Sequence, residues 1–253
     1  RIDLRFQTMS ILADRLDRPA DAIDDLREVL SLDPANLQAL AKLDELYGRT
    51  ENWEELKAIL QRRVGLTEHA QEKIGLLIRI GALFEGQLES IDGAIETYEQ
   101  ILSIDVNRSE AVTALERIFE DDEYAPFVAP VLEPTYTERN DWQGLVRVYS
   151  VMETSAGDPR ERVEFNYKIA RLQESEGGDV ASAFNSYAAA YRIEPDRMNT
   201  MHELLRLAEE LSNHRELTDL LRTMVDEVAE PTQRREVHWT IAQTLRDKCG
   251  DPE

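Results

Sequence analysis

The chain has 253 residues, of which 51 are acidic and 29 basic, for a formal net charge of −22. This charge repels phosphate, so it argues against nucleic-acid binding by the whole surface. With only eleven glycines and no alternating apolar pattern there are no candidate strands, and the single Cys249 excludes an internal disulfide and a Cys-x-x-Cys pair.

In chain order, the predicted elements are helices that each carry one apolar face. The first, at residues 22–30, has apolar residues at i, i+1, i+4, i+7 and i+8, a spacing typical of one side of an α-helix. The same spacing returns at 94–102 and 183–191. The three sets are Ala22, Ile23, Leu26, Val29 and Leu30; Ala94, Ile95, Tyr98, Ile101 and Leu102; and Ala183, Phe184, Tyr187, Ala190 and Tyr191. The segments that follow, 32–34, 104–106 and 193–195, also match, and in two of them a proline ends the helix because it lacks an amide hydrogen.

Further helices are predicted between these three. Residues 40–47 and 112–119 share one apolar pattern, and residues 53–60, 142–149 and 217–221 share another, which begins with Trp53 and Trp142 in its first two copies. Residue 94 stands 72 positions after residue 22, which is close to two helix-turn-helix units of about 34 residues. The sequence therefore predicts about six helix pairs in succession.

This pattern resembles the tetratricopeptide repeat (TPR), in which two antiparallel helices carry small residues where they cross and a proline at the exit. The matching positions are Ala22, Ala94 and Ala183 (small), Leu26, Tyr98 and Tyr187 (bulky, one turn later), and Pro34 and Pro195 (closing proline). The family's first-helix tryptophan and Leu-Gly pair are missing, and Val106 replaces one proline. The resemblance implies an all-α, right-handed α-solenoid of stacked antiparallel helix pairs, in a paired-repeat variant of the kind expected in a larger bacterial-type repeat protein.

One irregularity predicts an additional helix. Residue 183 stands 89 positions after residue 94, which is 17 more than the first offset, and the surplus falls near residues 121–141. Seventeen residues make about one helix and a turn. Pro126 can occupy the first turn of this helix, whereas Pro130 and Pro134 would each cost about 3 kcal/mol in a helix interior, so we expect a kinked or broken helix. It either changes the curvature of the superhelix near 121–141 or is an ordinary kinked helix without a function.

Residues 1–253 are expected to form one solenoid that is a piece of a longer repeat array. Aligning residues 11–16 with 241–245 places Gly250 to Glu253 where a second helix would begin, and neither end has the polar cap that repeat arrays need. The most apolar run, 74–84, is interrupted by Arg79 and is shorter than the roughly 20 residues that a bilayer requires. We expect a cytoplasmic protein, with a periplasmic location as the alternative.

The sequence offers no catalytic, cofactor-binding or metal-binding motif. His69, His202, His214 and His238 lie in different repeats, none spaced as a metal-binding pair. Phosphate-binding loops, calcium loops and nucleophile elbows are missing as well. We therefore expect no catalytic residue, no cofactor and no metal.

Acidic residues are concentrated in the middle of the chain. Twelve lie between Glu85 and Glu123, against two arginines, Arg108 and Arg117. This stretch either attracts a basic partner segment or is a solvated face that keeps the protein soluble.

In the TPR family the first helix of each pair lines a concave groove. By repeat register the resemblance implies nine groove candidates: Gln7, Ile11, Arg15, Ala41, Glu45, Arg79, Leu83, Lys168 and Leu172. Their mixture of apolar and charged types suits an extended or helical peptide better than a small metabolite. The family's chaperone-tail clamp is not expected, because Leu83 and Leu172 stand where its asparagine would follow Arg79 and Lys168.

Two functions follow from this reading. The first is a noncatalytic protein-protein interaction scaffold that presents a concave groove to peptide or protein partners. The alternative is a structural spacer or regulatory region of a larger enzyme or signalling protein. An all-α enzyme would require convergent polar groups in a pocket, which nothing in the pattern indicates.

Overall fold

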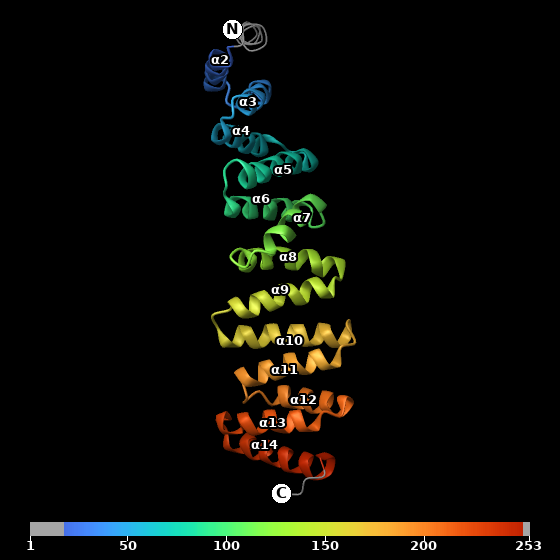
Figure 1. Ribbon diagram of the computed structural model, residues 1–253. Helices are drawn as coiled ribbons and strands as arrows, with labels where there is room; N and C mark the ends of the chain where they lie inside the picture. Colours follow the sequence, from blue (N-terminus) through green and yellow to red (C-terminus); the bar gives the residue numbers. More distant parts are fainter. Residues whose placement is uncertain (1–17, 250–253) are drawn as a thin grey trace. The chain divides into compact units, whose positions relative to one another are not determined.

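Every regular element that the structure describes is helical, in agreement with the predicted fold class. The computed structural model describes residues 18–249 (Figure 1). In this range each helix packs against the next one along the chain within its own unit, and the successive helices α8 to α14 run in opposite directions. The predicted TPR-like arrangement of stacked antiparallel helix pairs is therefore confirmed.

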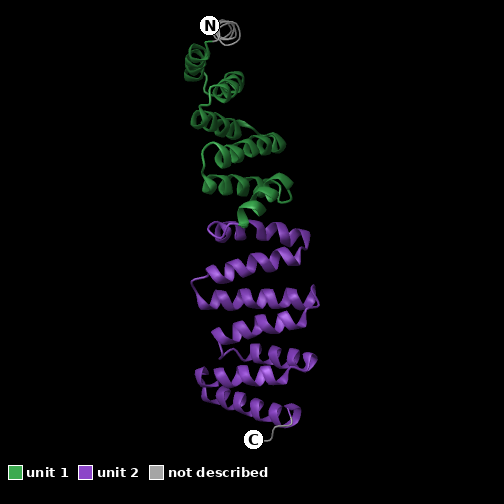
Figure 2. Cartoon of the chain, viewed as in Figure 1, with its two compact units in different colours: residues 1–120 green, residues 121–253 purple. Residues whose placement is uncertain are grey.

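The chain divides into two compact units, Arg1–Glu120 and Asp121–Glu253 (Figure 2). Unit 1 contains α2 (Pro19–Leu32), α3 (Leu37–Arg49), α4 (Trp53–Leu66), α5 (Ala70–Gly86), α6 (Ile91–Ile104) and α7 (Ser109–Phe119). Unit 2 contains α8 (Ala125–Arg139), α9 (Trp142–Ser155), α10 (Pro159–Ser175), α11 (Val180–Ile193), α12 (Met198–Leu211), α13 (His214–Met224), α14 (Pro231–Thr244) and the short helical turns η1 (Val225–Glu227) and η2 (Leu245–Cys249). Continuity of one solenoid across both units stays a prediction.

Short polar residues begin several helices. The side chain of Asn36 accepts a hydrogen bond from the Ala39 amide at the start of α3 at 3.0 Å. Asp141 and Asp179 do the same for α9 and α11, with acceptor distances of 3.0 and 2.9 Å. Each cap satisfies an amide hydrogen that has no partner inside the helix. The ends of α2, α6 and α11 at residues 32, 104 and 193 fall where the sequence predicts them.

The core of each unit consists of the apolar faces that the repeat pattern predicts. All fifteen residues of the three repeated sets are buried, with 0–7% of their surface exposed. In unit 2, α11 lies at the centre of the core, where Phe184 and Tyr191 are among the largest fully buried side chains. Burial of a large apolar side chain is worth about 1.5–3 kcal/mol, and here it depends on the neighbouring helices in the stack.

The predicted additional helix is α8, and it is one uninterrupted helix in spite of its prolines. Pro126 lies in its first turn, and Pro130 and Pro134 lie inside it. Because the three prolines are four residues apart, they share one side of the helix, where Pro130 and Pro134 are exposed. The carbonyl groups that lose a helical donor therefore lie on the side open to water. A broken helix is thus excluded, and the change in superhelix curvature stays a prediction.

Candidate interaction site

The nine predicted groove residues lie in several environments. Gln7, Ile11 and Arg15 are outside the described residues; Ala41, Glu45, Arg79 and Lys168 are exposed; Leu172 is half-buried; and Leu83 is buried. The exposed members lie on α3, α5 and α10, which are first helices of their pairs. Leu83 is only 7% exposed and belongs to the core of unit 1, so it offers little surface to a partner.

Asp44 connects three helices of unit 1 through a nearly buried carboxylate. It lies on α3 and is 7% exposed. Arg79 of α5 donates to both carboxylate oxygens, at 2.5 and 2.7 Å, and Arg63 of α4 donates to one of them at 2.5 Å. The hydrogen bond to Asp44 raises the pKa of Arg79. A bidentate ion pair therefore fixes the predicted groove residue Arg79 against α3.

Unit 2 contains an equivalent pair. Glu133 stands 89 positions after Asp44, and Lys168 stands 89 positions after Arg79. The Lys168 ammonium lies 3.4 Å from Glu133 Oε1 and 4.5 Å from the centre of the Tyr149 ring. The Tyr149 hydroxyl donates to the same oxygen at 2.7 Å, and burial together with this bond raises the pKa of Tyr149. The Lys168 ammonium also lies 5.4 Å from the centre of the Phe165 ring, so one carboxylate and two aromatic rings hold Lys168.

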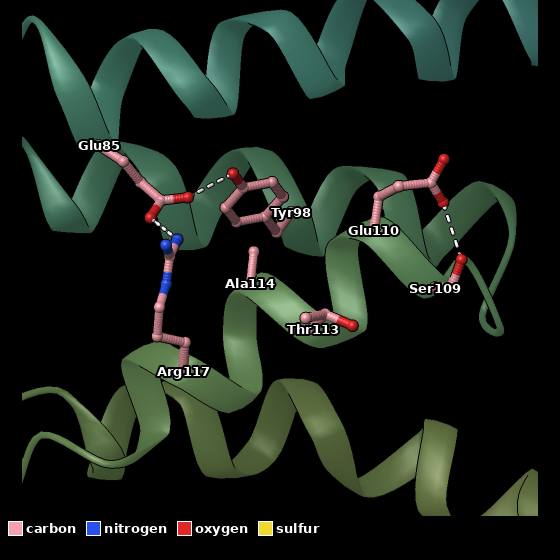
Figure 3. A pocket seen from close by; sticks show the side chains of 7 residues that line it. All are labelled: Glu85, Tyr98, Ser109, Glu110, Thr113, Ala114 and Arg117. Atoms are coloured by element: carbon pink, nitrogen blue, oxygen red, sulfur yellow. Dashed lines mark hydrogen bonds and ion pairs between the residues drawn. The ribbon is translucent and has the colours of Figure 1, made fainter.

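A hollow of about 450 Å³ lies between α5, α6 and α7 of unit 1 (Figure 3). Its lining residues are Glu85, Tyr98, Ser109, Glu110, Thr113, Ala114 and Arg117. The Tyr98 hydroxyl donates to Glu85 Oε1 at 2.5 Å, and Arg117 forms an ion pair with the other oxygen of Glu85. Burial, and secondly the bond to Glu85, raise the pKa of Tyr98. We call this site the α5–α7 hollow.

The far side of the α5–α7 hollow carries a second carboxylate. Glu110 lies in the first turn of α7 and accepts hydrogen bonds from Arg108 at 2.7 Å and from the Ser109 hydroxyl at 3.0 Å. The hydrogen bond from its own backbone amide, and secondly the one from Ser109, lower the pKa of Glu110. Its side chain is therefore charged at neutral pH. Tyr98 lies between Glu85 and Glu110 (Figure 3). The hollow thus has an aromatic wall with a carboxylate on either side.

The pair of Glu85 and Arg117 also has an equivalent in unit 2. Glu174 and Arg206 stand 89 positions later and form an ion pair at 2.8 Å. Sequence reasoning missed both ion-pair positions, although a signal was present. Residues of opposite charge recur at separations of 35 and 32 residues with the same 89-residue offset that the apolar positions show.

The surface of unit 1 near the hollow is acidic. Residues 85–120 contain nine acidic side chains and two arginines. Asp92, Glu96 and Glu99 are exposed on α6, and their spacing places them on one side of that helix.

Neither a metal site nor a membrane span is found among residues 18–249. No group of three or more His, Cys, Asp or Glu side chains there is placed to hold a metal ion. His202 and His214 instead lie 3.8 Å from Glu236 and Glu209. No helix in the same range has the length and the apolar character needed to cross a membrane.

The fold defines the class of this protein as a TPR-like helical repeat protein. No family model matches the chain, and no curated protein matches it either. Among solved structures it is similar to the TPR2AB domain of yeast Sti1 in complex with pHSP90. The two sequences are 15% identical, the match covers 96% of this chain and 98% of the Sti1 chain, and the TM-score is 0.33. The P58(IPK) TPR domain (13% identity, 98% and 74% covered, TM-score 0.31) and yeast Tom70 (15%, 98% and 48%, TM-score 0.30) are also similar. Because these TM-scores are below 0.5, the assignment rests on the helix pairs themselves.

Proposed function

We propose that this protein is a noncatalytic protein-protein interaction scaffold that presents a concave groove, lined by the first helices of its pairs, to peptide or protein partners. One observation carries the proposal. The first helices α3, α5 and α10 bury one side in the core and leave Ala41, Glu45, Arg79 and Lys168 exposed on the other. Ion pairs to a neighbouring helix hold Arg79 and Lys168 in place, which lowers the entropy lost when a partner binds.

The partner proposed is a protein or peptide, and its binding segment is basic. A net charge of −22 favours such a segment and disfavours nucleic acid. Both carboxylates of the α5–α7 hollow are paired with arginines, Glu85 with Arg117 and Glu110 with Arg108, which suits recognition better than proton transfer to a substrate. A cytoplasmic location is part of the same proposal.

A spacer or regulatory region of a larger enzyme or signalling protein is the second candidate function. It is favoured by the ion pairs that connect α3 with α5 and α8 with α10, since Asp44 with Arg79 and Glu133 with Lys168 would stiffen each unit. In this case the exposed faces would have no specific partner.

A site-specific crosslinking experiment separates the two functions. A photo-reactive amino acid is placed at Ala41 or Lys168 on first helices, and at Gln100 on α6 as an exposed second-helix control. The scaffold predicts discrete crosslinked proteins at the first-helix positions and few at Gln100. Equal and diffuse crosslinking at all three positions would favour the spacer.

A further inference from the structure

We propose that the α5–α7 hollow binds a lysine or arginine side chain of an extended partner peptide. This inference rests on the proposed scaffold function and adds the place and the chemistry of one contact. Three observations identify this occupant: the charge of the lining residues, the shape of the hollow, and the lack of an equivalent of Glu110 and Ala114 in unit 2.

The hollow suits a side chain that is apolar along its length and charged at its end. The Tyr98 ring, the Ala114 methyl group and Thr113 line its middle (Figure 3). The methylene groups of lysine and arginine pack well on such surfaces while the charged end stays near water.

Two carboxylates are available to the charged end. The side chain of Glu110 is 47% exposed, and it forms an ion pair with Arg108 at 2.7 Å and accepts a hydrogen bond from the Ser109 hydroxyl at 3.0 Å. Glu85 is 17% exposed and is neutralised by Arg117. Because each carboxylate pairs with one arginine, the more exposed of the two, Glu110, is the main anchor.

The same contact is not available in unit 2, although Glu85, Tyr98 and Arg117 have equivalents there. Asn199 stands 89 positions after Glu110 and carries no charge. Glu203 stands 89 positions after Ala114, and its carboxylate contacts Arg206 at 2.8 Å. A larger, charged side chain thus occupies the position where Ala114 leaves room. Recognition of a basic side chain is therefore a property of unit 1.

The test begins with a random 12-residue peptide library selected on the full chain at 0.15 M salt. Enriched peptides are expected to contain lysine or arginine. Their dissociation constants are then measured for the wild type, Glu110→Gln, Thr113→Trp and the control Glu99→Gln, which removes the same charge from α6. We expect affinity to fall about fivefold to tenfold in Glu110→Gln, at least as far in Thr113→Trp, and less than about twofold in Glu99→Gln.

A double-mutant cycle keeps the test valid if Thr113→Trp perturbs folding. Replacing the peptide's basic residue by norleucine should remove most of the difference between wild type and Glu110→Gln. This inference would be overturned if Glu110→Gln and Glu99→Gln lowered the affinity equally, or if neither Glu110→Gln nor Thr113→Trp changed the affinity of the enriched peptides. Either result would leave the scaffold function in place. Failure to enrich any peptide would count against both.

Discussion

The ion pair of Asp44 is expected to be worth more than any other charged contact between residues 18 and 120. The perturbation is Asp44→Asn, which keeps the side-chain shape and removes the charge. It affects three charge-assisted hydrogen bonds, at 2.5, 2.5 and 2.7 Å, each of which contributes about 1.5–3 kcal/mol. The loss should be smaller than their sum, because the side chain of Arg79 is 48% exposed and that of Arg63 is 21% exposed, so both guanidinium groups can be rehydrated. We expect destabilisation of about 2–3 kcal/mol.

The free energy of unfolding is measured by urea denaturation followed by circular dichroism. Because repeat proteins can unfold in parts, hydrogen exchange of the α3, α4 and α5 amides is measured as well. The control is Glu45→Gln on the same helix, since Glu45 is exposed and pairs only with Lys42 among its described contacts, at 2.7 Å. It should cost about 0.5 kcal/mol or less. If Asp44→Asn is no more destabilising than Glu45→Gln, the reasoning about the buried carboxylate is wrong.

Three further outcomes are expected. Gly81→Ala should destabilise the protein by about 1–3 kcal/mol in thermal or urea unfolding, because the added Cβ would lie 2.7 Å from the Tyr98 ring. The control Gly75→Ala, on the same helix, meets nothing within 4 Å and should stabilise by up to about 1 kcal/mol. Equal effects of the two substitutions would contradict the packing of Gly81 against Tyr98. Burial raises the pKa of Tyr191 to about 12, so the stability that depends on its neutral hydroxyl is complete below about pH 10 and is lost as pH rises toward 12. Tyr191→Phe should therefore reduce the fall in the free energy of unfolding over this pH range. An unchanged slope would show that Tyr191 is not the residue responsible. Trp239 is 65% exposed, so Trp239→Phe should remove most of the fluorescence that iodide quenches, and undiminished quenching would mean that this side chain is covered.

Most of the fold could be predicted from the sequence because it follows from apolar spacing. Ala22, Ala94 and Ala183 are fully buried, as their positions at helix crossings require. The additional helix α8 was predictable from the change in repeat offset alone. Its continuity was not, because the tolerance of Pro130 and Pro134 depends on which side of the helix faces water.

The site was less predictable, for two physical reasons. The run from Ile74 to Phe84 is apolar on nearly all sides of α5, so periodicity could not choose its buried face, and Leu83 was assigned to the groove. The buried charge of Asp44 is stable only because Arg63 and Arg79 approach from other helices. Contacts of this kind depend on tertiary packing, so they cannot be recognised from the spacing of residues within one repeat.

The ion pairs that connect α3 with α5 and α8 with α10 restrict where the chain can gain or lose residues. Asp44 and Arg79 are 35 residues apart, as are Glu133 and Lys168. Deleting one residue inside α4 would turn everything after it by about 100° around the helix axis and point Arg79 away from its carboxylate. The turn at 67–69 could absorb the same deletion without such a rotation. Length variation among related sequences should therefore be found in the turns and not in α4 or α9.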